Sequence, residues 1–174
     1  MGPPEPQRPG RQESKFQPYN EETRWALSEI RAWIGEIKAN QPPRWLSLLG
    51  RSGTGKTMLS RKASKEVGGR FRQWSKIMDA LREGHWHAKE MLISYPILVV
   101  DDLAAAHETD LSRATMDVLA DRRLGKWTIW TSNLSLEQVG DVSHRVRSRM
   151  LREGNRVVEI LNTECWATRQ TREA

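Results

Sequence analysis

The pattern of apolar and polar positions predicts a helix near the start of the chain. Between Asn20 and the segment 40–43, which contains two prolines, apolar residues recur at helical spacing. These residues are Leu27, Ile30, Ile34 and Ile37. Asn20 has the side chain of an N-cap, and prolines end helices. We therefore predict an amphipathic helix that begins after Asn20.

Short runs of strand-forming residues follow, each bounded by glycine, proline or polar residues. The runs cover 45–49, 97–100, 127–130 and 156–160, and a weaker one covers 70–74. The run 97–100 follows Pro96 and is apolar throughout, which is typical of a parallel strand buried on both faces.

Helical spacing separates these strands. The predicted helices cover the region from residue 57 to the glycines at 68–69, and residues 76–82, 110–123 and 141–151. The residues of 110–123 expected to face inward are Leu111, Ala114, Val118 and Leu119. Because strands and helices alternate, the sequence predicts an α/β fold with a parallel sheet and helices on both faces. Ligands bind such folds beyond the carboxyl ends of the strands.

Length and composition predict one domain preceded by a tail. The chain has 174 residues, of which 37% are hydrophobic, enough for one modest core. Residues 1–14 contain four prolines and two glycines among charged side chains. Such a composition buries too little apolar area to become ordered. We expect a disordered tail over 1–14 and one domain over 15–174.

The net charge and the cysteine content of the chain bear on its binding partners and its cellular location. The formal net charge of +6 and pI of about 9.8 favour an anionic partner such as nucleic acid, although a solvated basic surface would give the same balance. Cys165 is a lone cysteine and cannot form an internal disulfide. No signal peptide and no apolar run of about 18 residues is present, so we expect a cytoplasmic protein without membrane association. Most of the eight tryptophans are expected to pack in the core, with stacking on bases as the alternative.

The clearest chemical signal lies between the first predicted strand and the next helix. Residues 50–57 have the sequence Gly-Arg-Ser-Gly-Thr-Gly-Lys-Thr, which matches the phosphate-loop pattern G-x-x-x-x-G-K-[ST]. Its glycines let backbone N–H groups turn toward phosphate oxygens, and the following helix points its positive end at them. Lys56 is expected to contact the β- and γ-phosphates of ATP, and the Thr57 hydroxyl to ligate Mg²⁺. The predicted nucleotide-binding residues are Gly50, Arg51, Ser52, Gly53, Thr54, Gly55, Lys56, Thr57 and Met58.

Two further strand ends carry polar residues suited to this chemistry. Asp101 and Asp102 follow the buried strand 97–100, where carboxylates hold Mg²⁺ and orient an attacking water. We predict that Asp101 belongs to the Mg²⁺ shell and that Asp102 acts on the water; a solvated acidic turn is the alternative. Asn133 follows the strand 127–130, where its amide can reach the γ-phosphate or that water, although Ser and Asn favour turns in any case.

A basic pair lies on the last predicted helix. Arg145 and Arg149 are four residues apart beside an apolar row formed by Val142, Val146 and Met150. An arginine in such a position can stabilise charge on a transferred phosphoryl group, and across a subunit interface it makes hydrolysis depend on assembly. The alternative is a basic exposed face that includes Arg147 and Arg152.

Taken in order, these motifs resemble those of AAA+ ATPases of the DnaC-like helicase-loader group and the similar IstB-type transposition helpers. The segments that carry the resemblance are 16–20, 50–57, 97–103, 121–123, 131–134 and 148–150, and it covers about residues 16–169. The resemblance implies that Asn133 is a sensor-one residue and that Arg149 is an arginine finger acting in trans. It also implies that 16–20 forms the adenine-side wall and that Arg169 is a sensor-two arginine.

The same resemblance implies a P-loop NTPase with an AAA+ core that hydrolyses ATP in DNA replication as an ATP-dependent homo-oligomer. The chain continues for five residues after Arg169, so a lid domain is expected to be missing or vestigial. The expected partners are single-stranded DNA and a replicative helicase. Loaders of this group usually have an N-terminal helicase-docking domain, and here only a short tail precedes the core.

One stretch mixes cations with aromatic rings, as single-stranded DNA sites do. Its members are Arg70, Arg72, Trp74, Lys76, Arg82, His85, Trp86, His87 and Lys89. The alternative is a solvated basic face with Trp74 as a structural residue.

Two other functions stay open. An IstB-like ATPase would share this core and would assist a transposase in DNA transposition. A small-molecule or nucleotide kinase would also use a phosphate loop, and would pass phosphate to an acceptor other than water.

Overall fold

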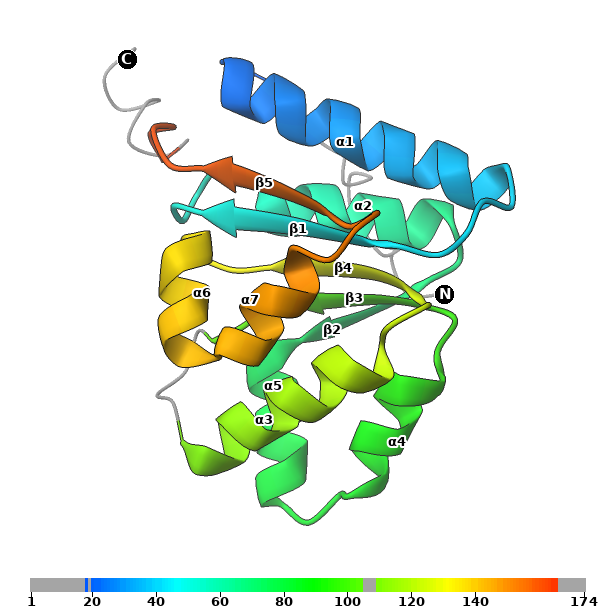
Figure 1. The fold of residues 1–174 in the computed structure, drawn as a ribbon, viewed down its shortest axis with the longest axis vertical. Coiled ribbons are helices and arrows are strands. Elements are labelled where there is room, and N and C mark those ends of the chain that lie inside the picture. Colours follow the sequence, from blue (N-terminus) through cyan, green and yellow to red (C-terminus); the bar gives the residue numbers. More distant parts are fainter. Residues whose placement is uncertain (1–17, 19, 105–108, 166–174) are drawn as a thin grey trace, which may run out of the picture.

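The computed structural model describes residues 18, 20–104 and 109–165, in which a five-stranded parallel sheet has helices on both faces (Figure 1). The strands are β1 (Trp45–Gly50), β2 (Arg70–Gln73), β3 (Ile97–Asp101), β4 (Trp127–Thr131) and β5 (Arg156–Ile160). Their order in the sheet is β2-β3-β4-β1-β5, and every neighbouring pair is parallel. The predicted α/β fold is confirmed.

The helices of the described residues are α1 (Glu21–Lys38), α2 (Lys56–Glu66), α3 (Trp74–Arg82), α4 (His87–Ser94), α5 (Asp110–Arg122), α6 (Leu136–Val142) and α7 (His144–Met150). As predicted, Asn20 caps α1, because its side chain accepts a hydrogen bond from the Thr23 backbone N–H at 2.9 Å. Among these residues, none of the helices is both long and apolar enough to cross a membrane. The tail predicted over 1–14 lies outside the described residues.

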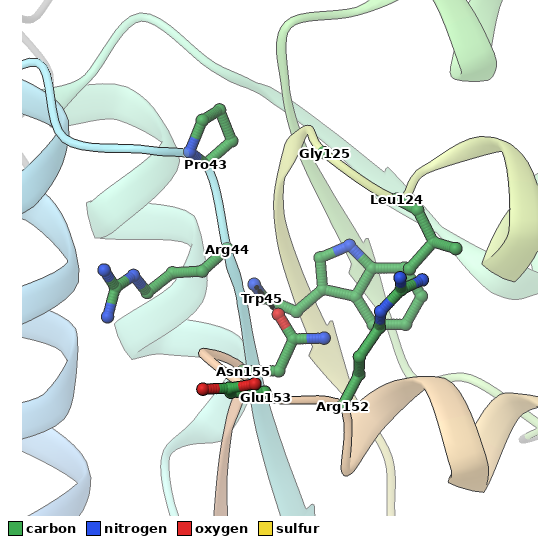
Figure 2. A pocket seen from close by; sticks show the side chains of 8 residues that line it. All are labelled: Pro43, Arg44, Trp45, Leu124, Gly125, Arg152, Glu153 and Asn155. Atoms are coloured by element: carbon green, nitrogen blue, oxygen red, sulfur yellow. Dashed lines mark hydrogen bonds between the residues drawn. The ribbon is translucent and has the colours of Figure 1, made fainter.

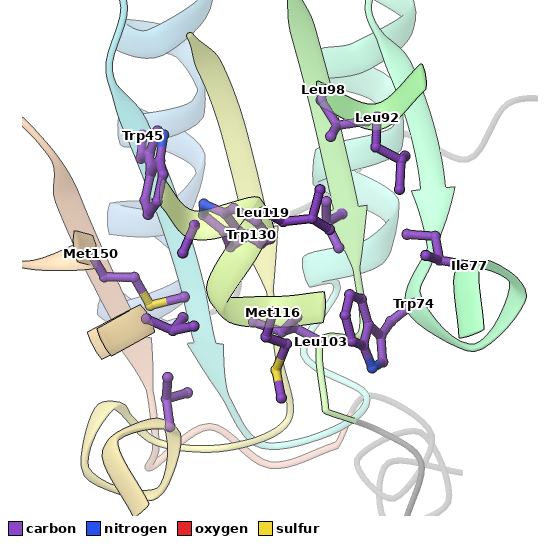
Figure 3. Packing of buried hydrophobic residues seen from close by; sticks show 14 of the residues in the cluster. Trp45, Trp74, Ile77, Leu92, Leu98, Leu103, Met116, Leu119, Trp130 and Met150 are labelled. Carbon is purple, nitrogen blue, oxygen red and sulfur yellow. The ribbon is translucent and has the colours of Figure 1, made fainter. Parts of the chain in front are cut away.

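Two hydrophobic clusters hold the helices against the sheet. Along β1, the side chains alternate between the faces: Trp45 and Leu49 pack in one cluster, and Leu46 and Leu48 in the other. The Trp45 cluster includes residues of α3 to α7 (Figure 3), and the second cluster lies against α1 and α2. In Figure 1, α1 accordingly lies on the opposite side of the sheet from α3, α4 and α5.

Tryptophan packing agrees with the expectation for most of these residues. The buried ones are Trp33, Trp45, Trp74, Trp127 and Trp130. Trp25 and Trp86 are exposed, and Trp166 lies outside the described residues. Two contacts are edge-to-face, between Trp33 and Trp127 and between Trp45 and Trp130.

The prediction of one helix over 141–151 is wrong, because the chain breaks at Ser143. Ser143 is extended (φ −150°, ψ 106°), and its hydroxyl accepts a hydrogen bond from the Val146 backbone N–H and donates one to Asp117 of α5. The preceding helix, α6, starts as early as Leu136. Its capping box joins Ser135 and Gln138, a Ser-x-x-Gln signal that was available in the sequence.

Other details also differ from the predictions. β2 ends at Gln73, so Trp74 begins α3. On α5, Ala114 and Val118 are exposed instead of facing inward, and the buried positions include Ser112 and Thr115. At its carboxyl end, α5 is also held by ion pairs of Asp121 with Arg145 and Arg149.

The helix α4 was not predicted, and a buried arginine binds the carbonyls at its carboxyl end. Arg123, which follows α5, is fully buried and donates hydrogen bonds to the carbonyls of Leu92, Ile93 and Tyr95. These carbonyls belong to the end of α4, where backbone acceptors lack partners within a helix. Burial lowers the pKa of Arg123 to about 10, so the guanidinium stays charged at neutral pH.

Candidate nucleotide-binding site

The phosphate loop joins β1 to α2 at the carboxyl edge of the sheet, as predicted. Gly50, Gly53 and Gly55 have positive φ values of 108°, 74° and 92°, which side chains rarely adopt. A Cβ added to Gly50 would lie 2.3 Å from the Ile160 carbonyl oxygen, and the Arg51 N–H donates to that same oxygen at 2.9 Å. The end of β5 therefore fixes the start of the loop.

Lys56 points back into the loop from the first turn of α2. Its side chain is buried, and Nζ donates to the carbonyl oxygens of Gly50 at 2.7 Å and Arg51 at 2.5 Å. Burial lowers the pKa of Lys56 to about 8, against the opposing effect of Asp102 and Asp101. This ammonium group lies inside the loop, where the sequence predicts a contact with phosphate.

Asp101, at the end of β3, lies next to the loop. Its Oδ2 accepts a hydrogen bond from the Thr57 hydroxyl at 3.2 Å, and its Oδ1 accepts one from the Thr131 hydroxyl at 2.7 Å. Asp101 as a whole is 2% exposed. Hydroxyl and carboxylate oxygens are the hard ligands that Mg²⁺ prefers, so the Thr57–Asp101 pair fits that ion.

Asp102 has a left-handed backbone conformation, and its side chain contacts the segment that follows β4. Its φ is +59°, and its Oδ1 accepts a hydrogen bond from Asn133 Nδ2 at 2.8 Å. Burial, and then the charge of Asp101, raise the pKa of Asp102, while Lys56 acts in the opposite direction. The ends of β3 and β4, which were both predicted to contribute to the site, are thus joined by a hydrogen bond.

Thr131, at the end of β4, belongs to the site, although the sequence alone predicts no role for it. Besides its bond to Asp101, its hydroxyl accepts a hydrogen bond from the Asp102 backbone N–H at 2.9 Å. One buried hydroxyl therefore fixes both aspartates. A threonine at a strand end gives no sequence signal of this role, because the contact depends on β4 lying beside β3.

The remaining predicted residues divide into three groups. Arg51 and Ser52 are exposed on the loop, Thr54 is buried, and Met58 is half-buried. Arg149 pairs with Asp121 of α5, at 3.0 Å between Nε and Oδ1, and with none of the described residues of the phosphate loop. Arg169 and, from the segment 16–20, residues 16, 17 and 19 lie outside the described residues.

A separate pocket lies at the opposite end of the strands from the phosphate loop (Figure 2). It has a volume of about 350 Å³ and is lined by residues that include Trp45, Leu124, Arg152 and Asn155. Trp45 begins β1, whereas Gly50 ends it, so the length of the strand, on the order of 17 Å, separates this pocket from the phosphate loop. The pocket is not part of the candidate site.

The stretch predicted to contact DNA is divided among β2, α3, a connection and α4. Trp74 is completely buried and cannot stack on a base, so its structural interpretation is correct. The guanidinium groups of Arg70 and Arg72 lie 5.8 and 5.7 Å from the centre of the Tyr95 ring. Trp86 is 58% exposed in the connection.

Comparison with solved structures places this site in a known fold. No protein-family model and no curated protein matches the chain. The crystal structure of the DnaC helicase loader matches with a TM-score of 0.67 and 25% identity, over 83% of this chain and 93% of the loader chain. This chain has the AAA+ fold. The predicted resemblance to DnaC-like AAA+ ATPases is confirmed.

Two other structures support the same fold. A DNA replication initiation factor has a TM-score of 0.68 at 21% identity over 89% of this chain. The replication initiator DnaA bound to AMPPCP and single-stranded DNA has a TM-score of 0.67 at 22% identity over 83% of this chain. This chain spans about half the length of these two proteins, because the match covers 51% of the initiation factor and 48% of DnaA.

Proposed function

We propose that this chain binds and hydrolyses ATP as an AAA+ protein of DNA replication, in the manner of a helicase loader, and assembles with copies of itself on single-stranded DNA. One observation carries the ATPase proposal. A phosphate loop, a carboxylate pair and an amide from three separate strand ends form one hydrogen-bonded network, through the contacts of Thr57 and Thr131 with Asp101 and of Asn133 with Asp102.

Each residue of the network has a role in the proposed reaction. The N–H groups of the loop and the Lys56 ammonium bind the β- and γ-phosphates. Thr57 and Asp101 would hold Mg²⁺, which neutralises charge on the phosphate oxygens when bound. Asp102, with its raised pKa, accepts a proton from the attacking water, and Asn133 orients Asp102. Arg149 of a neighbouring copy stabilises the charge on the transferred phosphoryl group.

The proposed partners rest on the comparisons and on exposed side chains. The matched DnaC structure is a helicase loader, and the matched DnaA structure holds single-stranded DNA and AMPPCP, an analogue of ATP. On this chain, the exposed ring of Trp86 lies between His85 and His87, with Arg82 exposed nearby in sequence. An exposed aromatic ring suits stacking on bases, and the neighbouring arginine suits contact with phosphates. We propose single-stranded DNA and a replicative helicase as partners.

The test measures ATP turnover per subunit as protein concentration rises, with and without a single-stranded DNA oligonucleotide. We expect the rate to climb with concentration and to respond to the DNA, because the arginine comes from a neighbouring copy. Lys56→Ala, which removes the ammonium from the loop, is the inactive control. A rate that is flat and unaffected by DNA would contradict the assembling, DNA-coupled enzyme, and phosphate found on an acceptor other than water would favour a kinase.

A further inference from the structure

Asp121, near the end of α5, forms ion pairs with two arginines of α7. Its Oδ1 lies 3.0 Å from Arg149 Nε, and its Oδ2 lies 3.1 Å from Arg145 Nη1. Both carboxylate oxygens are thus engaged, and the three charges leave one net positive charge. The group therefore keeps its attraction for an anion.

The nitrogen through which Arg149 contacts Asp121 decides which hydrogen-bond donors of Arg149 remain available for a ligand. A guanidinium group can bind oxygens through its Nε side or through its two terminal nitrogens. In the described part of the chain, the only hydrogen bond of the Arg149 side chain is through Nε. The side chain is 35% exposed, so the two Nη groups keep their donors for a ligand outside the subunit.

The backbone that carries Arg149 is fixed at both ends of α7. At its start, the Ser143 hydroxyl donates to Asp117, one turn before Asp121 on α5, at 2.5 Å. At its end, Asn155 Nδ2 donates to the Arg149 carbonyl at 2.8 Å, and Asn155 Oδ1 accepts from the backbone N–H of Trp45, also at 2.8 Å. Trp45 begins the strand that ends in the phosphate loop. α7 is therefore tied to α5 and to β1.

We propose that Asp121 is a positioning residue that holds Arg149 by Nε and presents its two Nη groups to the phosphates bound by a neighbouring copy. This inference rests on the proposed function, in which Arg149 acts in trans. Without the carboxylate, the long arginine side chain would sample many conformations, and only a fraction of them would meet the phosphate. Asp121 does not touch the nucleotide.

The first test compares Asp121→Ala with the wild-type protein in ATP binding and in turnover. We expect kcat to fall by roughly 10- to 100-fold, as a small misplacement of a reacting group does, while the Kd for ATP stays unchanged. Asp121→Asn, which keeps an oxygen acceptor for Nε, should recover part of the loss. Asp141→Ala, which removes an exposed carboxylate from α6, is the matched control and should keep wild-type turnover.

The second test mixes variants, which a merely structural role would not predict. Asp121→Ala has an intact nucleotide site and lacks a positioned arginine, so mixing it with Lys56→Ala should restore turnover. Mixing it with Arg149→Ala should restore none, because both variants lack the same contribution. If Asp121→Ala fails to fold, Asp121→Asn replaces it in both mixtures.

The outcomes separate this inference from the proposed function. If Arg149→Ala is defective and Asp121→Ala turns over ATP like the wild type, the positioning role is wrong and the proposed function stands. If Asp121→Ala is defective and Lys56→Ala does not rescue it, its defect is not in the donated arginine, and the positioning role is again wrong. If Arg149→Ala keeps wild-type turnover, the action of Arg149 in trans is wrong, and the inference is wrong with it.

Discussion

The hydroxyl of Thr131, at the end of β4, donates a hydrogen bond of 2.7 Å to the carboxylate of Asp101, at the end of β3. Both side chains are almost completely buried. The same hydroxyl accepts the Asp102 backbone N–H, so one side chain sets the direction of both aspartates. The geometry of the candidate catalytic residues therefore depends on a residue that lies outside the phosphate loop and has no role of its own in the proposed reaction.

Replacing Thr131 with valine should remove both hydrogen bonds while keeping the shape of the side chain. We expect the free energy of unfolding to fall by about 1–3 kcal/mol, because a buried donor and acceptor lose their partner. Turnover of ATP should fall as well. Chemical denaturation and a phosphate-release assay measure the two effects, and Thr131→Ser, which keeps the hydroxyl, should stay close to the wild type in both. A Thr131→Val protein as stable as the wild type would contradict this role.

Asp102→Asn should bind ATP normally and hydrolyse it slowly. The amide keeps the size of the side chain but cannot accept a proton from water, and loss of a general base costs typically 100-fold or more. Binding of a fluorescent ATP analogue and single-turnover hydrolysis separate the two steps. Asp141→Asn, at an exposed position of α6, is the control. Equal hydrolysis rates in Asp102→Asn and the wild type would exclude Asp102 as the base.

Gly50→Ala should be more damaging than a glycine substitution elsewhere with a similar backbone. Gly50 and Gly154 both have positive φ, but a Cβ at Gly50 would meet the Ile160 carbonyl, whereas one at Gly154 would meet nothing within 4 Å. Gly154→Ala should therefore cost only the backbone strain, about 1–2 kcal/mol. Gly50→Ala should add the effect of the clash, about 1–3 kcal/mol, and weaken ATP binding. Denaturation midpoints of the two variants measure the difference, and equal losses would show that the contact with β5 is unimportant.

Glu22, in the first turn of α1, should make stability depend on pH. Its carboxylate accepts hydrogen bonds from the Thr163 hydroxyl at 2.5 Å and from the Asn162 backbone N–H at 3.1 Å. Burial raises the pKa of Glu22, but the hydrogen bonds from Thr163 and Asn162 outweigh it, and the pKa lies below its usual value of 4.5. The corresponding stability is fully present above pH 4.5 and is lost as pH falls through the lower pKa of the folded state.

The comparison of Glu22→Gln with the wild type measures this contribution. We expect the variant to melt at a lower temperature at pH 7, and the difference to shrink at an acidic pH below 4.5 at which the Glu22 carboxylate becomes protonated. Glu21→Gln, at the exposed neighbouring position, is the matched control. A gap that stays constant between the two pH values would contradict the role of the Glu22 charge.

The sequence predicted the features that depend on neighbours along the chain. The apolar run 97–100 became the buried strand β3, and the Asn20 cap marks the start of α1. The glycines at 50, 53 and 55 have the backbone that a phosphate loop needs. Spacing, capping and backbone freedom operate over a few residues, so a sequence pattern is sufficient to find them.

What the sequence left undecided involves buried polar groups that find partners far away in the chain. The apolar row through Val139, Val142, Val146 and Met150 has unbroken helical spacing, yet the chain breaks at Ser143, where the hydroxyl reaches Asp117 of α5. Likewise, α4 ends on carbonyls that the buried Arg123 satisfies. Neither partner can be identified from local spacing.

In the candidate site, too, some features follow from the local sequence and others only from the tertiary structure. The sequence by itself determined the phosphate loop, because its glycines and its lysine act within eight consecutive positions. Only the tertiary structure decided that Thr131 fixes Asp101 and that Asp121 holds Arg149, across 30 and 28 positions of the chain. The reason is physical: strand order and helix packing bring these groups together, and a buried polar group must then pair with whatever partner the fold supplies.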